Sequence, residues 1–212
     1  MKMKVIEFEN LNVEVVRKKN VKRARINVYK DDRIRLVLPY LYPKFIVKDF
    51  LTTNLEWINS KLKLNASKRL PSDKTRLLGE IYTIEFEDSI KTISFDKKII
   101  KAPNELKFKE FKKEFAKVKY RELIDIYQPL VGREVKRLSI KDMNTRWGSC
   151  NSTKGYINLA LNLVEKRSAL IEYVVLHELT HLLYPHHQKS FYKFIEEIMP
   201  DYKKREIELK FG

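Results

Sequence analysis

The most informative segment of this chain is a ten-residue stretch near its C-terminal end, YVVLHELTHL, which spans residues 173–182. Within it, His177, Glu178 and His181 form the pattern H-E-x-x-H. Residues four apart lie on the same face of a helix, so both imidazoles can bind one metal ion. Glu178 projects beside them and can act as a general base toward a water molecule. The stretch therefore predicts a helix that carries a metal site.

The residues around this motif supply the helical setting that it requires. Apolar side chains recur at helical spacing, which predicts a helix from about Ser168 to Tyr184 with one buried face. These apolar residues are Leu170, Ile171, Val174, Val175, Leu179 and Leu182.

A third ligand is expected just beyond the helix, because catalytic zinc sites normally use three protein ligands. All four histidines of the chain lie between His177 and His187. Pro185 should bend the chain, so a side chain after it can return to the metal. The interval from His181 favours His187, as in H-E-x-x-H-x-x-G-x-x-H proteases, with His186 as the alternative. Zinc is the first choice of metal, although Fe, Ni, Cu and Mn also accept imidazole ligands.

Further from the motif, the hydrophobic pattern predicts an α+β fold. Residues 1–103 are expected to form a basic, β-rich subdomain with one amphipathic helix between Lys44 and about Leu64. It should contain a hairpin in which Ala24–Tyr29 and Arg33–Pro39 pair around Asp31-Asp32. Residues 104–212 are expected to form the metal-dependent catalytic subdomain, on which the N-terminal half packs. Its expected elements are helices over Asn104 to about Ile126, Ser168–Tyr184 and Ser190–Ile198, and strands over Leu138–Met143 and Tyr156–Leu161.

Composition excludes several classes of protein. The chain has 212 residues, of which 43% are hydrophobic, and this is too apolar for a disordered chain. A single cysteine excludes a disulfide framework and indicates a reducing compartment. Glu7 and Glu9 interrupt any apolar core of a signal peptide, and no stretch reaches the length of a membrane span. We therefore expect a cytoplasmic protein without a membrane partner.

The charge is strongly and unevenly basic. The formal net charge is +16, and residues 1–150 hold 35 Lys and Arg against 20 Asp and Glu. The densest patch, Arg17–Arg25, has six positive charges and no acid. Such a face attracts nucleic acids or nucleotides. The simpler alternative is a coding bias toward lysine, since Lys outnumbers Arg by 31 to 13.

Four segments of this chain resemble the YgjP-like metallopeptidase domain, also called the DUF45 or WLM-related zincin group. They are Arg146–Cys150, Tyr156–Leu159, Tyr173–Leu182, and His187 with Phe191-Tyr192. The resemblance implies a zincin-like fold in which His177, His181 and His187 bind the metal and Glu178 is catalytic. It also implies a strand edge alongside the metal helix, to which an extended substrate can add. Tyr156–Leu161 is the expected edge strand.

Two further residues near the motif have alternative interpretations. Arg146 is predicted either to be catalytic, stabilising an oxyanion or holding a substrate carboxylate or phosphate, or to pair structurally with an acid. Cys150 is a nucleophile or metal ligand in one interpretation and a small buried apolar side chain in the other, which is favoured.

These observations predict a zinc-dependent hydrolase, foremost a metallopeptidase with a peptide or protein substrate. One alternative is a metal-dependent hydrolase of nucleotide phosphoanhydrides, which fits the basic N-terminal half. Another is a protease or binding protein associated with nucleic acid, and a third is a structural metal site without turnover.

Overall fold

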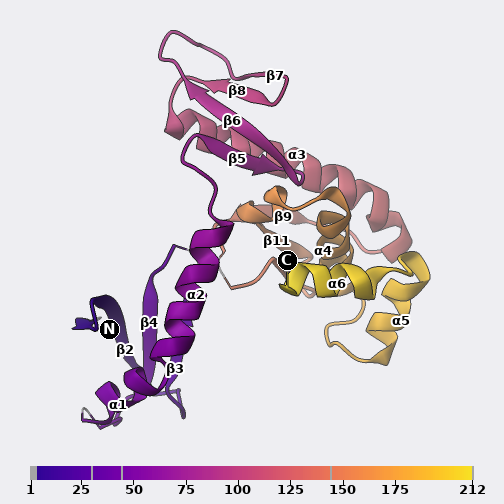
Figure 1. Ribbon diagram of the computed structural model, residues 1–212. Helices are drawn as coiled ribbons and strands as arrows, with labels where there is room; N and C mark the ends of the chain where they lie inside the picture. The colour runs from indigo at the N-terminus through magenta and orange to yellow at the C-terminus, as the bar shows by residue number, and fades with distance from the viewer. Residues whose placement is uncertain (1–3, 30, 44, 144, 212) are drawn as a thin grey trace. The chain divides into compact units, whose positions relative to one another are not determined.

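The computed structural model describes residues 4–29, 31–43, 45–143 and 145–211. The chain forms two compact units, Met1–Arg69 and Leu70–Gly212. Within the described residues, six α-helices and three small sheets give a mixed α+β fold, which confirms the predicted class (Figure 1). None of the described helices combines the length and apolar character that crossing a membrane requires.

The first unit is a four-stranded sheet with two helices. Its elements are β1 (Lys4–Phe8), β2 (Leu11–Lys18), β3 (Arg25–Val28), β4 (Ile34–Pro39), α1 (Ile46–Thr53) and α2 (Leu55–Lys68). The strand order is β1-β2-β4-β3, with β2 and β4 parallel and the other pairs antiparallel. Alternate residues of β4, Ile34, Leu36 and Leu38, meet Leu51 and Ile58 of the helices in a separate core.

Two sequence predictions concern this unit. The predicted hairpin is confirmed, because β3 and β4 pair antiparallel. The single predicted helix is instead divided at Asn54, where the backbone leaves the helical conformation between α1 and α2. Lys44, its predicted first residue, lies outside the described residues.

The second unit begins with a small sheet that packs on a long helix. The sheet contains β5 (Lys74–Leu77), β6 (Glu80–Phe86), β7 (Ser94–Asp96) and β8 (Ile99–Ala102), in the order β5-β6-β8-β7. The helix α3 (Glu105–Val131) begins at Asn104, whose side chain accepts a hydrogen bond from the Lys107 backbone N–H. Leu77, Ile84 and Ile100 of the sheet share one core with Phe108 of α3. The compact units thus divide after Arg69 and not near Pro103, because this sheet finds its apolar partner in α3.

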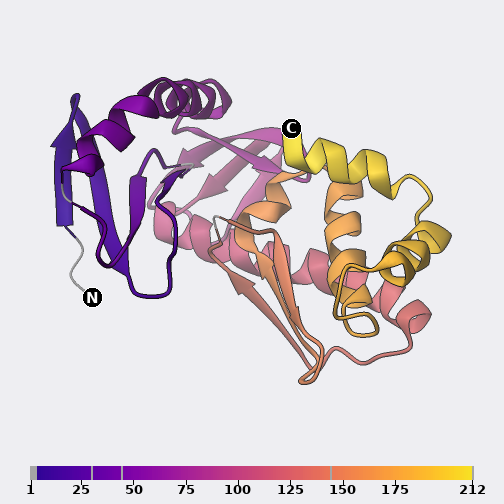
Figure 2. The same cartoon turned by 90° about the horizontal axis from the view of Figure 1, so that it is seen from below.

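The remainder of the second unit surrounds one buried helix. It contains β9 (Arg137–Lys141), β10 (Gly148–Asn151), β11 (Tyr156–Ala160), the 3-10 helix η1 (Leu161–Glu165), α4 (Ser168–Thr180), α5 (Lys189–Ile198) and α6 (Tyr202–Phe211). Helix α4 lies among α3, α5, α6 and the β10-β11-β9 sheet (Figure 2). Nine of its residues are buried, so its apolar surface extends almost all the way around instead of along one stripe. This packing fixes the helix that carries the H-E-x-x-H motif.

One buried hydrogen bond joins α3 to the sheet beside α4. The Tyr120 hydroxyl, in a fully buried side chain, donates to the Ala160 carbonyl oxygen at 2.9 Å. We expect Tyr120→Phe to lower the free energy of unfolding by about 1–2 kcal/mol, because the carbonyl loses its buried donor. Urea denaturation measures this change. Tyr82→Phe, which removes a half-buried hydroxyl in the same unit, should change it by less than about 0.5 kcal/mol, and an equal loss in both variants would contradict the role of the bond.

Candidate functional site

The structure brings three of the four histidines together at the end of α4. His177 lies in the last turn of α4 and His181 is its C-terminal cap, so the two rings project from the same face. His187 lies in the loop before α5, and its Nε2 is 3.0 Å from Nε2 of His177. One ring nitrogen from each histidine lies within 4.8 Å of the others. Such a cluster of nitrogen atoms is suited to a single transition metal ion.

The loop between α4 and α5 determines which of the adjacent histidines joins the cluster. The chain leaves the helix after Thr180, several residues before Pro185, and the backbone N–H groups of Leu183 and Tyr184 both donate to the Thr180 carbonyl. This turn returns His187 to the other two rings, whereas His186 is exposed and outside the group. The predicted bend therefore exists but begins earlier than Pro185.

Hydrogen bonding and burial keep the rings of His177 and His181 in a form that can bind a cation. Nδ1 of His181 donates to the Tyr184 carbonyl at 3.1 Å, which leaves Nε2 of that ring as a lone-pair donor. Burial, followed by the neighbouring His181 and His187, lowers the pKa of His177 to about 3. His181 also has a lowered pKa, chiefly through burial. Both rings are thus neutral at pH 7, the state in which imidazole binds metal.

His177 also shows an uncompensated polar atom. Its Nδ1 is buried and has no hydrogen-bond partner among the described residues. Its Nε2 faces another ring nitrogen, that of His187. A cation bound between Nε2 of His177 and Nε2 of His187 would accept the lone pairs of both nitrogens. These side chains therefore fit a metal site better than a cluster of histidines that are hydrogen-bonded only to one another.

One aromatic ring, that of Phe191, contacts all three imidazoles. Phe191 of α5 is fully buried, and its ring centroid lies 4.9 Å from that of His177, 4.7 Å from His181 and 4.8 Å from His187. The ring of Tyr192 stacks on that of His187, with the two centroids 6.0 Å apart. These contacts restrict the ring orientations before any metal binds.

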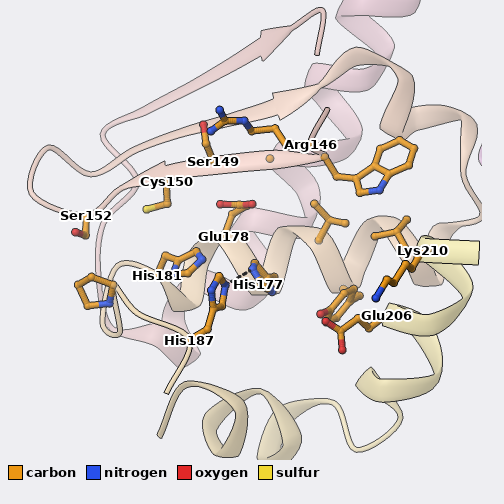
Figure 3. A pocket seen from close by; sticks show the side chains of 16 residues that line it. Arg146, Ser149, Cys150, Ser152, His177, Glu178, His181, His187, Glu206 and Lys210 are labelled. Atoms are coloured by element: carbon orange, nitrogen blue, oxygen red, sulfur yellow. Dashed lines mark hydrogen bonds between the residues drawn. The ribbon is translucent and has the colours of Figure 1, made fainter. Parts of the chain in front are cut away.

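Glu178 points from α4 toward β10, between the imidazoles and the strand that carries Ser149 and Cys150 (Figure 3). The residue is only 6% exposed. Burial raises the pKa of its carboxyl to about 8, while the positive charge of Arg146 lowers it. A cation bound by the nearby histidines would lower this pKa further and favour the carboxylate.

Gly148 makes room for that carboxyl group. A Cβ atom at position 148 would lie 2.5 Å from Oε1, 2.6 Å from Cγ and 2.7 Å from Cδ of Glu178. Any other residue at position 148 would therefore displace the glutamate or the strand. Gly148 is thus a requirement of the site that the sequence analysis did not identify.

The other residues singled out from the sequence lie on β10 or just before it. Arg146 is exposed, and in Figure 3 its side chain runs toward Ser149 and away from the histidines. Cys150 is half-buried, and burial, followed by the charge of Glu178, raises the pKa of its thiol to about 12. A thiol with this pKa is protonated at neutral pH and is a poor nucleophile.

A cavity of about 650 Å³ connects these groups. Its wall comprises the start of β10, the histidine face of α4 and one side of α6, which contributes Glu206, Leu209 and Lys210. The sequence interpretation did not include α6, whose pattern shows no clear apolar stripe. It also did not identify Phe191 as a support of the histidines, although its spacing of four from His187 at a helix start is a detectable signal.

The edge strand beside α4 differs from the one expected. The strand order is β10-β11-β9, so β11 is central and paired on both sides, and the prediction of an edge at Tyr156–Leu161 is wrong. The edge next to the cavity is β10, which pairs only with β11 in the described sheet. The pattern of Tyr156–Leu161 is that of a strand buried on both faces, and the short, polar β10 has too weak a signal to be recognised.

Comparisons with known proteins give one family. The sequence profile of the YgjP-like metallopeptidase domain matches residues 22–211. Among solved structures, the chain is similar to the metallopeptidase zymogen of Pyrococcus abyssi abylysin, with 20% identity and a TM-score of 0.40. That similarity covers 42% of this chain and 90% of the other. No curated protein matches.

We expect alanine variants to identify the metal ligands. His177→Ala, His181→Ala and His187→Ala should each lose stoichiometric metal at neutral pH, because a site with two imidazoles binds much more weakly. His186→Ala is the matched control and should keep its metal. Metal analysis of the purified variants measures this. Full metal content in His177→Ala or His181→Ala would disprove the site. Among the two adjacent histidines, loss of metal in His186→Ala alone would make His186 the third ligand in place of His187.

Proposed function

Because the chain belongs to the YgjP-like metallopeptidase family, we propose that it is a zinc-dependent peptidase in which Glu178 is the general base. The observation that carries this proposal is a buried carboxyl group directed into the same cavity as three converging imidazoles. A structural metal site has no need of such a group, which is costly to bury. The fold is accordingly proposed to be zincin-like.

The proposed metal ligands are His177, His181 and His187. Three imidazoles and an open side toward the cavity fit zinc, and Fe, Ni, Cu and Mn are alternatives. Zinc bound at this site would act as a Lewis acid, which polarises a carbonyl group and lowers the pKa of water. Phe191 and the Tyr184 carbonyl hold the ligands in place, so little ordering is needed on binding.

In the proposed mechanism Glu178 moves the proton. Its carboxylate oxygen accepts a proton from the attacking water and then donates it to the leaving amine of the peptide. The pocket formed by α4, β10 and Gly148 holds the carboxyl group in one place and keeps it away from bulk water. Close positioning of this kind converts the proton transfer into an effectively intramolecular step.

The substrate is proposed to bind as an extended peptide along β10. The outer edge of this strand is not paired in the described sheet, so its backbone groups can hydrogen-bond to an added strand. Arg146 lies at the start of β10 and is exposed in the cavity wall. Since its side chain runs away from the histidines, we propose that it holds a substrate carboxylate instead of an oxyanion.

We expect Glu178→Gln to bind metal normally but to lose about 10²- to 10⁴-fold in turnover, the usual scale for a general acid–base group. Peptide-library cleavage by the metal-analysed variant measures it, with nucleoside triphosphates as a parallel arm for the nucleotide alternative. Glu206→Gln removes a carboxylate from the same cavity and is the matched control, with turnover near that of the parent. Unchanged turnover in Glu178→Gln would disprove the mechanism. Phosphate release that depends on Glu178 would show that the substrate is a nucleotide and not a peptide.

A second variant tests the position of the carboxyl group. Gly148→Ala should retain metal but lose turnover and thermal stability, because the added Cβ overlaps the Glu178 side chain. Combining it with Glu178→Asp, which shortens the side chain by one methylene, should recover part of the stability. Thermal unfolding of both single variants and the double variant measures this coupling. Strict additivity of the two changes would contradict the contact.

A further inference from the structure

We propose that one end of the sheet in the first unit is a binding surface for single-stranded nucleic acid. This surface, the basic tip, consists of residues 17–25, residues 40–43 and Phe45. It belongs to a different unit from the histidine cluster. The proposal therefore does not depend on the peptidase function.

The sheet topology brings the two segments of the basic tip together. Strands β2 and β4 run parallel, with Lys18 opposite Pro39, so both chains leave the sheet at the same end. Strand β3 begins at the same end, where Arg25 lies opposite Val37 of β4. The loop between β2 and β3 and the loop after β4 are thus neighbours, although about twenty residues separate them in the sequence.

The charge of the basic tip is uncompensated. Six of residues 17–25 are Lys or Arg, and residues 17–25 and 40–48 contain no acid. The side chains of Lys18, Lys22, Arg23 and Arg25 are exposed and make no hydrogen bond or ion pair within the described part of the chain. Elsewhere in the same sheet, arginines are paired, as Arg35 is with Glu14 at 2.7 Å. A high lysine content alone does not place six cations in nine residues with no acid among them.

Apolar side chains are exposed among these charges. Leu41 is 88% exposed, Phe45 78% and Tyr40 58%. The Arg17 guanidinium donates hydrogen bonds to the carbonyls of Tyr40 and Tyr42, which ties this loop to the end of β2. The Lys19 ammonium group lies 5.9 Å from the centre of the Tyr40 ring. An aromatic face and a cation therefore lie side by side at Tyr40.

This combination fits the chemistry of a single strand. Unpaired bases stack on aromatic rings while the phosphates lie against Lys and Arg, and the stacking tolerates any base sequence. A bilayer with anionic headgroups would use the same charges, but it takes up aliphatic side chains as readily as aromatic ones. Two of the three exposed apolar side chains at the basic tip are aromatic, which favours nucleic acid.

The test is fluorescence anisotropy of the full chain with a labelled single-stranded DNA of about 20 nucleotides. Binding at about 50 mM salt should weaken steeply as salt rises, with a log–log slope of about 0.7 per phosphate neutralised. Lys22→Glu with Arg23→Glu should weaken it about tenfold or more and reduce the slope. Lys61→Glu with Lys63→Glu, the same charge change on the exposed surface of α2, is the matched control and should have a much smaller effect.

Phe45 distinguishes stacking from apolar insertion. Phe45→Leu and Phe45→Ala should both weaken DNA binding by about fivefold or more, because each removes the aromatic face. Vesicles of phosphatidylserine and phosphatidylcholine are the parallel probe, and Phe45→Leu should keep any membrane affinity. The proposal is overturned by absence of DNA binding at low salt, by equal effects of the two double variants, or by vesicle binding that Phe45→Leu leaves unchanged while DNA does not bind.

Discussion

The contact between Gly148 and Glu178 is the constraint around which the site is arranged. A carboxyl group on a buried helix needs space that only a residue without a side chain can leave, and β10 supplies it. Because β10 approaches α4 so closely, the carboxyl is shielded from water on that side, and its pKa rises. The same approach places the free edge of the strand beside the imidazoles. One backbone position thus links the environment of Glu178 to the edge of β10 that is unpaired in the described sheet.

The imidazoles depend on a different kind of packing. Phe191 contacts all three rings without occupying any ring nitrogen, and the Tyr184 carbonyl additionally accepts a hydrogen bond from Nδ1 of His181. Burial of His177 also keeps that ring neutral. Protonation would otherwise compete with a cation for the same lone pairs. The apolar support and the low pKa therefore act in the same direction, toward a site that prefers a metal ion to a proton.

The two units of the chain have separate cores and separate chemistry. The second unit contains the histidine cluster, the buried glutamate and the cavity. The first contains the basic tip, where parallel pairing of β2 and β4 gathers unpaired cations and exposed aromatic rings. Charge of one sign at the end of a small sheet is an unfavourable arrangement for stability. A partner with phosphate groups would relieve this repulsion.

Features that depend on local periodicity could be predicted from the order of the amino acids. Helical spacing placed His177 and His181 on one face with Glu178 beside them, alternation marked the β3–β4 hairpin, and the charge pattern located the basic segment at Arg17–Arg25. Features that depend on contacts between residues distant in sequence could be established only from the folded chain. The tertiary structure returned His187 to the other two rings, made β10 and not β11 the edge strand, and set Gly148 against Glu178. It also joined β5–β8 to α3, so that the units divide after Arg69. The physical reason is that a periodic pattern shows which face of an element is apolar, but not which partner will cover it.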